Sequence, residues 1–146
     1  MKKKVIISSC LLGELCRYDG KMKKVSGVTL AFKDYDIIPF CPESPLFGVP
    51  RQKIDVVEID GKNRIITNQT NEDVTAKLQK YINEFIDKNP KVDKIVLKSK
   101  SPSCGVGTTP ILNREKEIIT YGNGVAGNIM LKKYPNIKID DERKYI

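Results

Sequence analysis

The chain has 146 residues, of which 40% are hydrophobic and 30% are charged, a composition typical of one globular domain with its own core. No stretch approaches the roughly 20 consecutive apolar residues that a membrane-spanning helix needs, so a membrane-embedded protein is excluded. The net charge of +8 comes from scattered basic residues, which favours a lysine-rich surface over a nucleic-acid groove and is compatible with an anionic small molecule.

Alternating apolar runs and turn residues predict alternating strands and helices. The basic and then apolar start is too short for a signal peptide and lacks a small-residue cleavage site, so we expect a first strand and a cytoplasmic protein. The clearest helix should begin with Asn71 as its cap and end before Asn89 and Pro90. In chain order we predict a strand at 4–9, a weak helix within 23–34, a strand at 35–40, a loop at 44–52, a hairpin of 55–59 with 64–67, the clear helix, a strand at 94–98, a hairpin-like segment around 113–116, a last helix up to about 134 and a strand at 137–139.

This order of elements predicts an α/β fold. We expect a single domain over residues 1–146, with a mostly parallel sheet flanked by helices and a small hairpin. In such a fold, ligands bind outside the carboxyl ends of the strands. Cys10, Cys41 and Cys104 each follow the end of a predicted strand, so we expect three thiols at the same edge of the sheet.

Four cysteines and no histidine limit the chemistry that the chain can perform. The cysteine spacing excludes a zinc knuckle and a thioredoxin-like motif, and the lack of histidine excludes Ser–His and Cys–His catalysis. A lone cysteine is more often a small buried hydrophobe, but three at equivalent strand ends favour a metal centre. Three thiolates can hold zinc with an open position, or a four-iron cluster with one iron lacking a protein ligand. Cys16, in a polar turn, is a weaker candidate for a fourth ligand.

Four short motifs follow one another along the chain. They are Ser8-Ser9-Cys10-Leu11-Leu12-Gly13, Arg17-Tyr18-Asp19-Gly20, Cys41-Pro42-Glu43 and Ser101-Pro102-Ser103-Cys104-Gly105. In this order they resemble the successive motifs of the bacterial thiouracil desulfurase family. Gly122-Asn123-Gly124-Val125 also resembles the glycine-rich stretch that precedes the last helix of that family. The resemblance covers essentially the whole chain.

The resemblance implies a [4Fe-4S] cluster held by Cys10, Cys41 and Cys104, with the fourth iron lacking a protein ligand. It also implies that Glu43 and Ser101 take part in catalysis. The expected activity is non-redox, lyase-type removal of sulfur as sulfide from a thiocarbonyl small molecule, such as a thiolated nucleobase like 2-thiouracil. Two loops, 45–51 and 108–116, depart from the family pattern, which leaves the substrate open.

Within this interpretation, Glu43 relays protons and activates water, while Ser101 orients the water or the substrate by hydrogen bonding. The N-terminus of the helix after Gly124 is a further candidate for holding an anionic group.

Two other functions stay open from the sequence. One is a non-catalytic zinc or iron–sulfur binding module, or a sulfur carrier that acts with a protein or RNA partner. A buried site with Glu43 facing away from it would favour that function. The other is an accessory protein acting on thiolated bases in tRNA, which a continuous basic face around the cysteines would support. The oligomeric state is left open.

Overall fold

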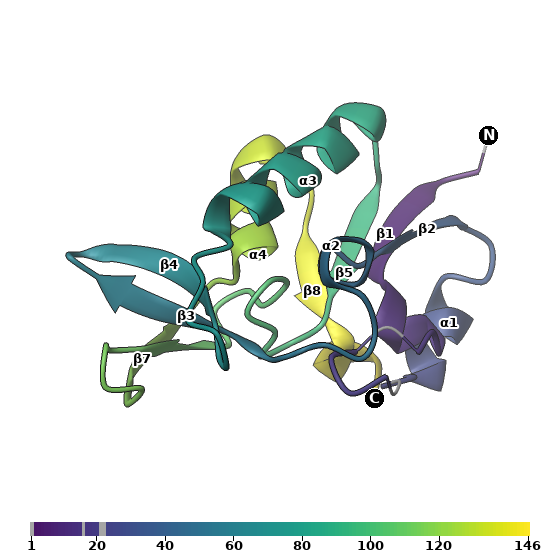
Figure 1. Cartoon of the computed structure of the whole chain (residues 1–146). Coiled ribbons are helices and arrows are strands. Elements are labelled where there is room, and N and C mark those ends of the chain that lie inside the picture. The colour runs from purple at the N-terminus through teal and green to yellow at the C-terminus, as the bar shows by residue number, and fades with distance from the viewer. Residues whose placement is uncertain (1, 16, 21–22) are drawn as a thin grey trace.

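The computed structural model describes residues 2–15, 17–20 and 23–146. Cys16, considered above as a fourth ligand, lies outside the described residues. The described chain forms two four-stranded sheets, with helices on both sides of the first sheet (Figure 1). The elements in chain order are β1 (Lys4–Ser8), η1 (Ser9–Leu12), α1 (Ser26–Ala31), β2 (Asp36–Phe40), α2 (Ser44–Phe47), β3 (Ile54–Ile59), β4 (Lys62–Thr67), α3 (Thr75–Lys88), β5 (Lys94–Leu97), β6 (Thr109–Leu112), β7 (Ile118–Gly122), α4 (Val125–Lys133), β8 (Ile139–Asp141) and η2 (Glu142–Tyr145).

The first sheet has the strand order β2-β1-β5-β8, and its strands run parallel. Its central strand β1 is covered on both faces, because Val5, Ile6 and Ile7 are all fully buried. Ile6 packs toward α3 and α4, whereas Val5 and Ile7 pack toward α1 and η1. Burial on both faces explains why this strand is a continuous apolar run rather than an alternating one. The predicted α/β class is confirmed.

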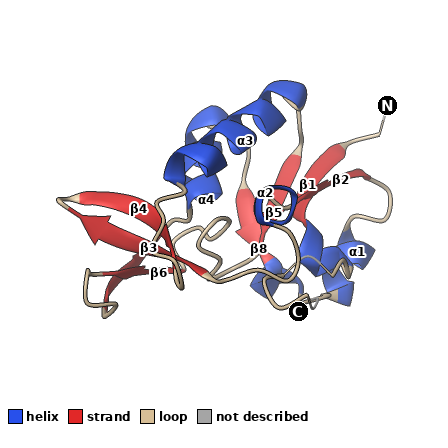
Figure 2. Cartoon of the chain, in the orientation of Figure 1, coloured by secondary structure: helices blue, strands red, loops and turns tan. Residues whose placement is uncertain are grey.

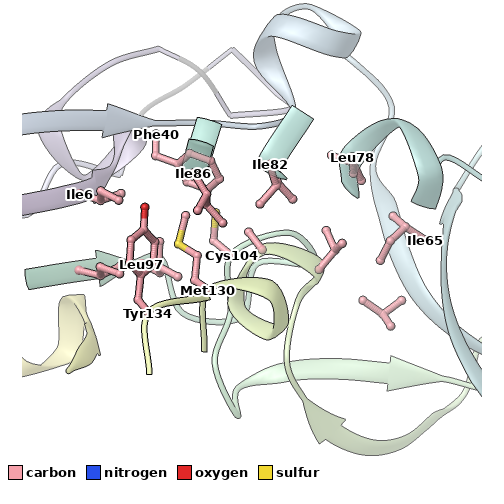
Figure 3. Close-up of a cluster of buried hydrophobic side chains, with 14 of the residues drawn as sticks. Ile6, Phe40, Ile65, Leu78, Ile82, Ile86, Leu97, Cys104, Met130 and Tyr134 are labelled. Atoms are coloured by element: carbon pink, nitrogen blue, oxygen red, sulfur yellow. The ribbon is translucent and has the colours of Figure 1, made fainter. Parts of the chain in front are cut away.

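The larger core cluster lies between the first sheet, α3, α4 and the second sheet (Figure 3). Leu78, Ile82 and Ile86 repeat every fourth residue along α3 and therefore share one face of that helix. Each buried aliphatic side chain of this kind contributes about 1.5–3 kcal/mol to folding. Cys104 lies among these side chains, near Met130 of α4, so the core supports one wall of the cysteine site.

The second sheet combines two hairpins, in the order β4-β3-β6-β7 (Figure 2). The hairpin of β3 with β4 was predicted, and β6 with β7 forms around the predicted polar turn at 113–116. The parallel pairing of β3 with β6 joins them, with Val56 opposite Ile111. The expected small hairpin is thus half of a second sheet, because its buried face needs a partner to complete the core.

Three local predictions are wrong. Residues 44–47, expected to be a loop, form the short helix α2, since a proline is tolerated in a helix's first turn. Helix α3 begins at Thr75 rather than near Asn71, and Asp73 accepts a hydrogen bond from the Thr75 N–H at 3.0 Å in place of an Asn71 cap. The closing strand β8 lies at Ile139–Asp141, two residues later than expected at its start.

Across the described ranges, the structure contains no helix with both the length and the apolar character needed to cross a membrane.

Candidate functional site

Three cysteines meet at the carboxyl edge of the first sheet. Cys10 lies in η1 directly after β1, Cys41 follows β2, and Cys104 lies in the loop after β5. Because β2, β1 and β5 are adjacent parallel strands, their following loops converge at one edge. All three side chains are reduced thiols, and all three line one cavity of about 630 Å³. The structure therefore brings together the cysteines that the sequence places at strand ends.

Burial is the main influence on the Cys104 thiol and raises its pKa to about 12. The charges of Cys41 and Glu43 raise the pKa further, whereas a hydrogen bond from Ser8 lowers it. The Cys104 thiol is therefore protonated near neutral pH. Because only the thiolate binds metal, loading of this position must release a proton.

The three thiols are soft donors of the kind that both zinc and iron–sulfur clusters take. A zinc ion needs its ligands within about 2.3 Å of one point. In the part of the chain that the structure describes, no three cysteine, aspartate or glutamate side chains are grouped so as to hold one metal ion. Each thiolate of a four-iron cluster binds a different iron, so its ligands surround a cavity instead of converging. Three sulfur donors that line one cavity are compatible with such a cluster.

Glu43 lies on the wall of the same cavity, and both of its carboxylate oxygens are bound. Ser103 Oγ donates a hydrogen bond to Glu43 Oε2 at 2.6 Å, and Arg51 Nε donates to Glu43 Oε1 at 3.4 Å. The Arg51 and Glu43 side chains are only 5% and 12% exposed, so water screens this ion pair little. Arg51 is itself held by the Gly48 carbonyl, which accepts from Nη1 at 3.0 Å. The carboxylate is therefore fixed in orientation on the cavity wall.

Ser101 also lines the cavity, and its hydroxyl organises the loop that carries Cys104. Ser101 Oγ accepts the N–H of Ser103 at 3.2 Å and the N–H of Cys104 at 3.0 Å. The Ser101 carbonyl accepts a hydrogen bond from Thr109 Oγ1 at 2.7 Å. Side-chain and backbone groups of Ser101 together hold the loop in one shape.

Backbone hydrogen bonds from helix α4 hold this loop. The first N–H groups of the helix donate to loop carbonyls, from Val125 to Pro102 at 3.2 Å and from Ala126 to Ser103 at 2.6 Å. The expectation that this helix N-terminus holds an anionic group is therefore wrong, because those N–H groups already bind the protein's own backbone. The same contact explains the glycine-rich stretch before the helix.

Glu142, which no sequence motif indicated, holds the beginning of the loop. Its Oε1 accepts the N–H of Ser99 at 2.7 Å, and its Oε2 accepts from Ser99 Oγ at 2.6 Å and from Lys98 Nζ at 3.2 Å. Burial by itself raises the pKa of Glu142, but the bonds from Ser99 and the charge of Lys98 together lower it below its usual value. A glutamate in a charged C-terminal segment carries no local signal of such a contact.

Cationic side chains line the cavity around the cysteines. Arg17, Lys23, Lys53 and Lys100 belong to this lining, and within the described residues none of them has an ion-pair partner. Lys53 Nζ lies 4.9 Å from the centroid of the Tyr18 ring, which also lines the cavity. The resulting positive potential favours a negatively charged ligand.

Three comparisons with known proteins identify the family and the fold of the chain. The model of the 2-thiouracil desulfurase family matches residues 5–142. A solved structure of a [4Fe-4S]-dependent thiouracil desulfidase, TudS, matches with a TM-score of 0.72 at 28% identity, covering 98% of this chain and 93% of that one. The uncharacterized protein YbbK of Bacillus subtilis (strain 168) is 29% identical over 117 residues, which are 70% of this chain and 74% of YbbK. The chain belongs to the 2-thiouracil desulfurase family.

Proposed function

We propose that this protein is an iron–sulfur-dependent, non-redox desulfidase that releases sulfide from a thiocarbonyl small molecule such as a thiolated nucleobase. One observation carries the proposal: three thiols and a fixed carboxylate line a single cavity in a member of this family. TudS, which shares the fold, is by name a [4Fe-4S]-dependent thiouracil desulfidase. The net reaction exchanges the sulfur of C=S for the oxygen of water and forms hydrogen sulfide, so no net electron transfer is needed.

Cys10, Cys41 and Cys104 would hold a [4Fe-4S] cluster, with one iron lacking a protein ligand. When bound, such a cluster supplies a Lewis-acidic iron with affinity for the substrate's sulfur. Cys104 is only 5% exposed, so bulk water has little access to this thiol.

Glu43 would act as the proton-transferring residue. Its carboxylate is held on the cavity wall by Arg51 and Ser103, so it can take a proton from a water that adds to the thiocarbonyl carbon. It would then return that proton to the departing sulfur. The position of Glu43 on the cavity wall gives no support to a non-catalytic module, which we expected to have this residue facing away.

Ser101 would assist by hydrogen bonding. Its hydroxyl accepts from two backbone N–H groups and also lies 3.1 Å from Ser103 Oγ, so contact with water or substrate requires it to exchange one of these bonds. The two bonds from the backbone also keep the loop and the Cys104 thiol in place.

The cationic lining favours thiolated substrates that carry a negative charge. Lys23 and Lys53 lie on the cavity wall with Arg17, where they would attract a phosphate attached to the thiolated nucleoside. A nucleotide and a thiolated RNA share this chemistry, so the RNA function left open by the sequence remains a second candidate.

The test is sulfide release from 2-thiouracil by anaerobically purified protein, compared with the Glu43→Gln variant. We expect uracil and sulfide in equal amounts from the wild type. Loss of a proton-transferring residue typically costs about 10²–10⁴-fold in rate, so Glu43→Gln should fall by that factor while retaining its iron. Full activity of Glu43→Gln with its iron intact would contradict the role of this residue. Three substrates should be tested on the iron-loaded wild type: 2-thiouracil, the corresponding nucleoside 5′-monophosphate and a thiolated RNA. If none of them releases sulfide, the proposed function is contradicted.

A further inference from the structure

Ser103 belongs to the loop that carries Cys104, residues 98–108, which we call the cysteine loop. Its hydroxyl contacts both proposed catalytic residues, Glu43 and Ser101. Its Oγ lies 2.6 Å from Glu43 Oε2 and 3.1 Å from Ser101 Oγ. Ser103 lies on the cavity wall but is only 1% exposed, so it offers very little surface to a substrate. Its hydroxyl is already bound to Glu43 and Ser101, so we expect its main effect on the reaction to pass through these neighbours.

The direction of the hydrogen bonds follows from the chemistry of the groups. A hydroxyl has one proton and two lone pairs, whereas an ionised carboxylate only accepts. Ser103 Oγ lies 2.6 Å from the carboxylate and 3.7 Å from Cys104 Sγ, so its single proton belongs to Glu43. Ser101 Oγ uses its lone pairs on two N–H groups and has its proton left for Ser103 Oγ.

This chain of bonds runs in one direction, from Ser101 through Ser103 to Glu43. Each hydroxyl donates its proton toward the carboxylate, and such chains strengthen one another inside a protein. The other carboxylate oxygen is bound by Arg51. Glu43 is thus held by two donors from separate segments, which lie 8 and 60 residues away in sequence.

We propose that Ser103 is the positioning residue for Glu43, and that Ser101 acts on the reaction through Ser103. The proposal rests on the proposed desulfidase function. Without the Ser103 hydroxyl, Oε2 keeps no donor from the cysteine loop and the carboxylate can rotate about the remaining Arg51 contact. Ser101 would lose the acceptor for its proton in the same change.

The direct test replaces Ser103 by Ala in anaerobically reconstituted protein, with 2-thiouracil as substrate and rates expressed per cluster from the iron content. Misplacement of a catalytic group by about 1 Å can cost 10²-fold, so we expect kcat to fall by about 10- to 100-fold. KM should stay within about twofold, because Ser103 exposes almost no surface to the cavity and its hydroxyl is bound to Glu43. Ser103→Thr keeps a hydroxyl and should restore most of kcat.

A double-mutant cycle separates positioning from a general structural role. If Ser103 acts through Glu43, adding Ser103→Ala to Glu43→Gln should cause no further loss of kcat. If the two residues acted independently, the losses of kcat caused by Ser103→Ala and Glu43→Gln would multiply in the double variant. Thr75→Ala is the matched control, because Thr75 is a buried hydroxyl that binds the Ile65 N–H at 2.8 Å and does not line the cavity. It should lower the unfolding temperature while leaving kcat unchanged.

The outcomes also separate this proposal from the function on which it rests. Wild-type activity that is lost in Glu43→Gln but fully kept in Ser103→Ala would overturn the positioning role alone. Multiplying effects in the double variant, or failure of Ser103→Thr to restore kcat at wild-type iron content, would overturn it as well. An iron-loaded wild type without sulfide release would overturn the desulfidase function first.

Discussion

Gly124 lies directly against the backbone of Ser103. A Cβ atom at Gly124 would come within 2.7 Å of the Ser103 carbonyl carbon and within 2.8 Å of the Pro102 carbonyl oxygen. The glycine lets α4 approach the cysteine loop closely enough for its first N–H groups to bind the loop carbonyls. The resemblance of this stretch to the family pattern thus has a physical reason.

Gly124→Ala should therefore disturb the cysteine loop. Forcing a methyl group against backbone atoms costs about 1–3 kcal/mol, and we expect a lower unfolding temperature and a lower iron content. Gly122→Ala is the control, since its Cβ would meet only the Ile111 side chain at 3.5 Å. Thermal unfolding and iron analysis check both variants. Equal stability and iron content in Gly124→Ala and wild type would show that the loop does not depend on this contact.

The cationic lining should control which thiolated compounds the protein accepts. Replacing Lys23 and Lys53 by Gln should raise KM several-fold for a thiolated nucleotide and leave KM for neutral 2-thiouracil nearly unchanged. Added salt should reproduce this effect by screening the charges. Lys80→Gln, an exposed residue of α3 outside the cavity lining, is the control.

Steady-state kinetics with the nucleotide, the free base and a thiolated RNA separate the substrates that share this chemistry. A larger effect of the variants on RNA than on the nucleotide would indicate that more than one phosphate is bound. Equal changes in KM for charged and neutral substrates would show that these lysines do not recognise the charge of the substrate.

Glu142 should stabilise the fold most at pH values above the range in which its carboxyl group titrates. Its pKa is lowered in the folded protein from the usual value of 4.5, because the Ser99 bonds and the Lys98 charge outweigh burial. A lowered folded-state pKa gives stability that is present above the unfolded-state value and is lost as pH falls through the folded-state value. Glu142→Gln should therefore cost about 1–3 kcal/mol at neutral pH, and the difference from wild type should shrink below pH 4.5.

Urea unfolding of the two proteins over this pH range measures the difference directly. Glu142→Asp, with a shorter side chain, should recover only part of it. A difference that grows as the pH falls would mean that the folded-state pKa of Glu142 is raised instead of lowered.

The Cys104 thiol should react slowly in the folded apoprotein. Burial raises its pKa from 9.0 to about 12, so the reactive thiolate is roughly a thousandfold rarer at neutral pH than for an ordinary cysteine. Iodoacetamide labelling followed by peptide mass analysis should show a much slower rate for Cys104 in the folded than in the urea-unfolded chain. Similar rates in both states would mean that Cys104 is neither buried nor shifted.

Local sequence patterns predicted the elements that position the site. The apolar run of β1 and the turn residues after β1, β2 and β5 were enough to place Cys10, Cys41 and Cys104 at one edge, because parallel strands share a polarity. The motif order also led to the correct family.

The contacts that hold the site could not be predicted in the same way. Ser103 binds Glu43 across 60 residues and Glu142 binds Ser99 across 43 residues, and no periodicity or turn signal links such positions. The pairing of Val56 with Ile111, which makes the second sheet, likewise depends on packing of the whole chain. Long-range side-chain bonds and strand pairings are decided by tertiary structure rather than by local propensity.

The most direct measurement is the iron and acid-labile sulfide content of anaerobically purified protein, for the wild type and for single alanine variants of the four cysteines. We predict about four irons and four sulfides per wild-type chain, lost in Cys10→Ala, Cys41→Ala and Cys104→Ala and kept in Cys16→Ala. One zinc per chain without sulfide, or a cluster that survives loss of any one of the three cysteines lining the cavity, would contradict a cluster held by these three thiolates.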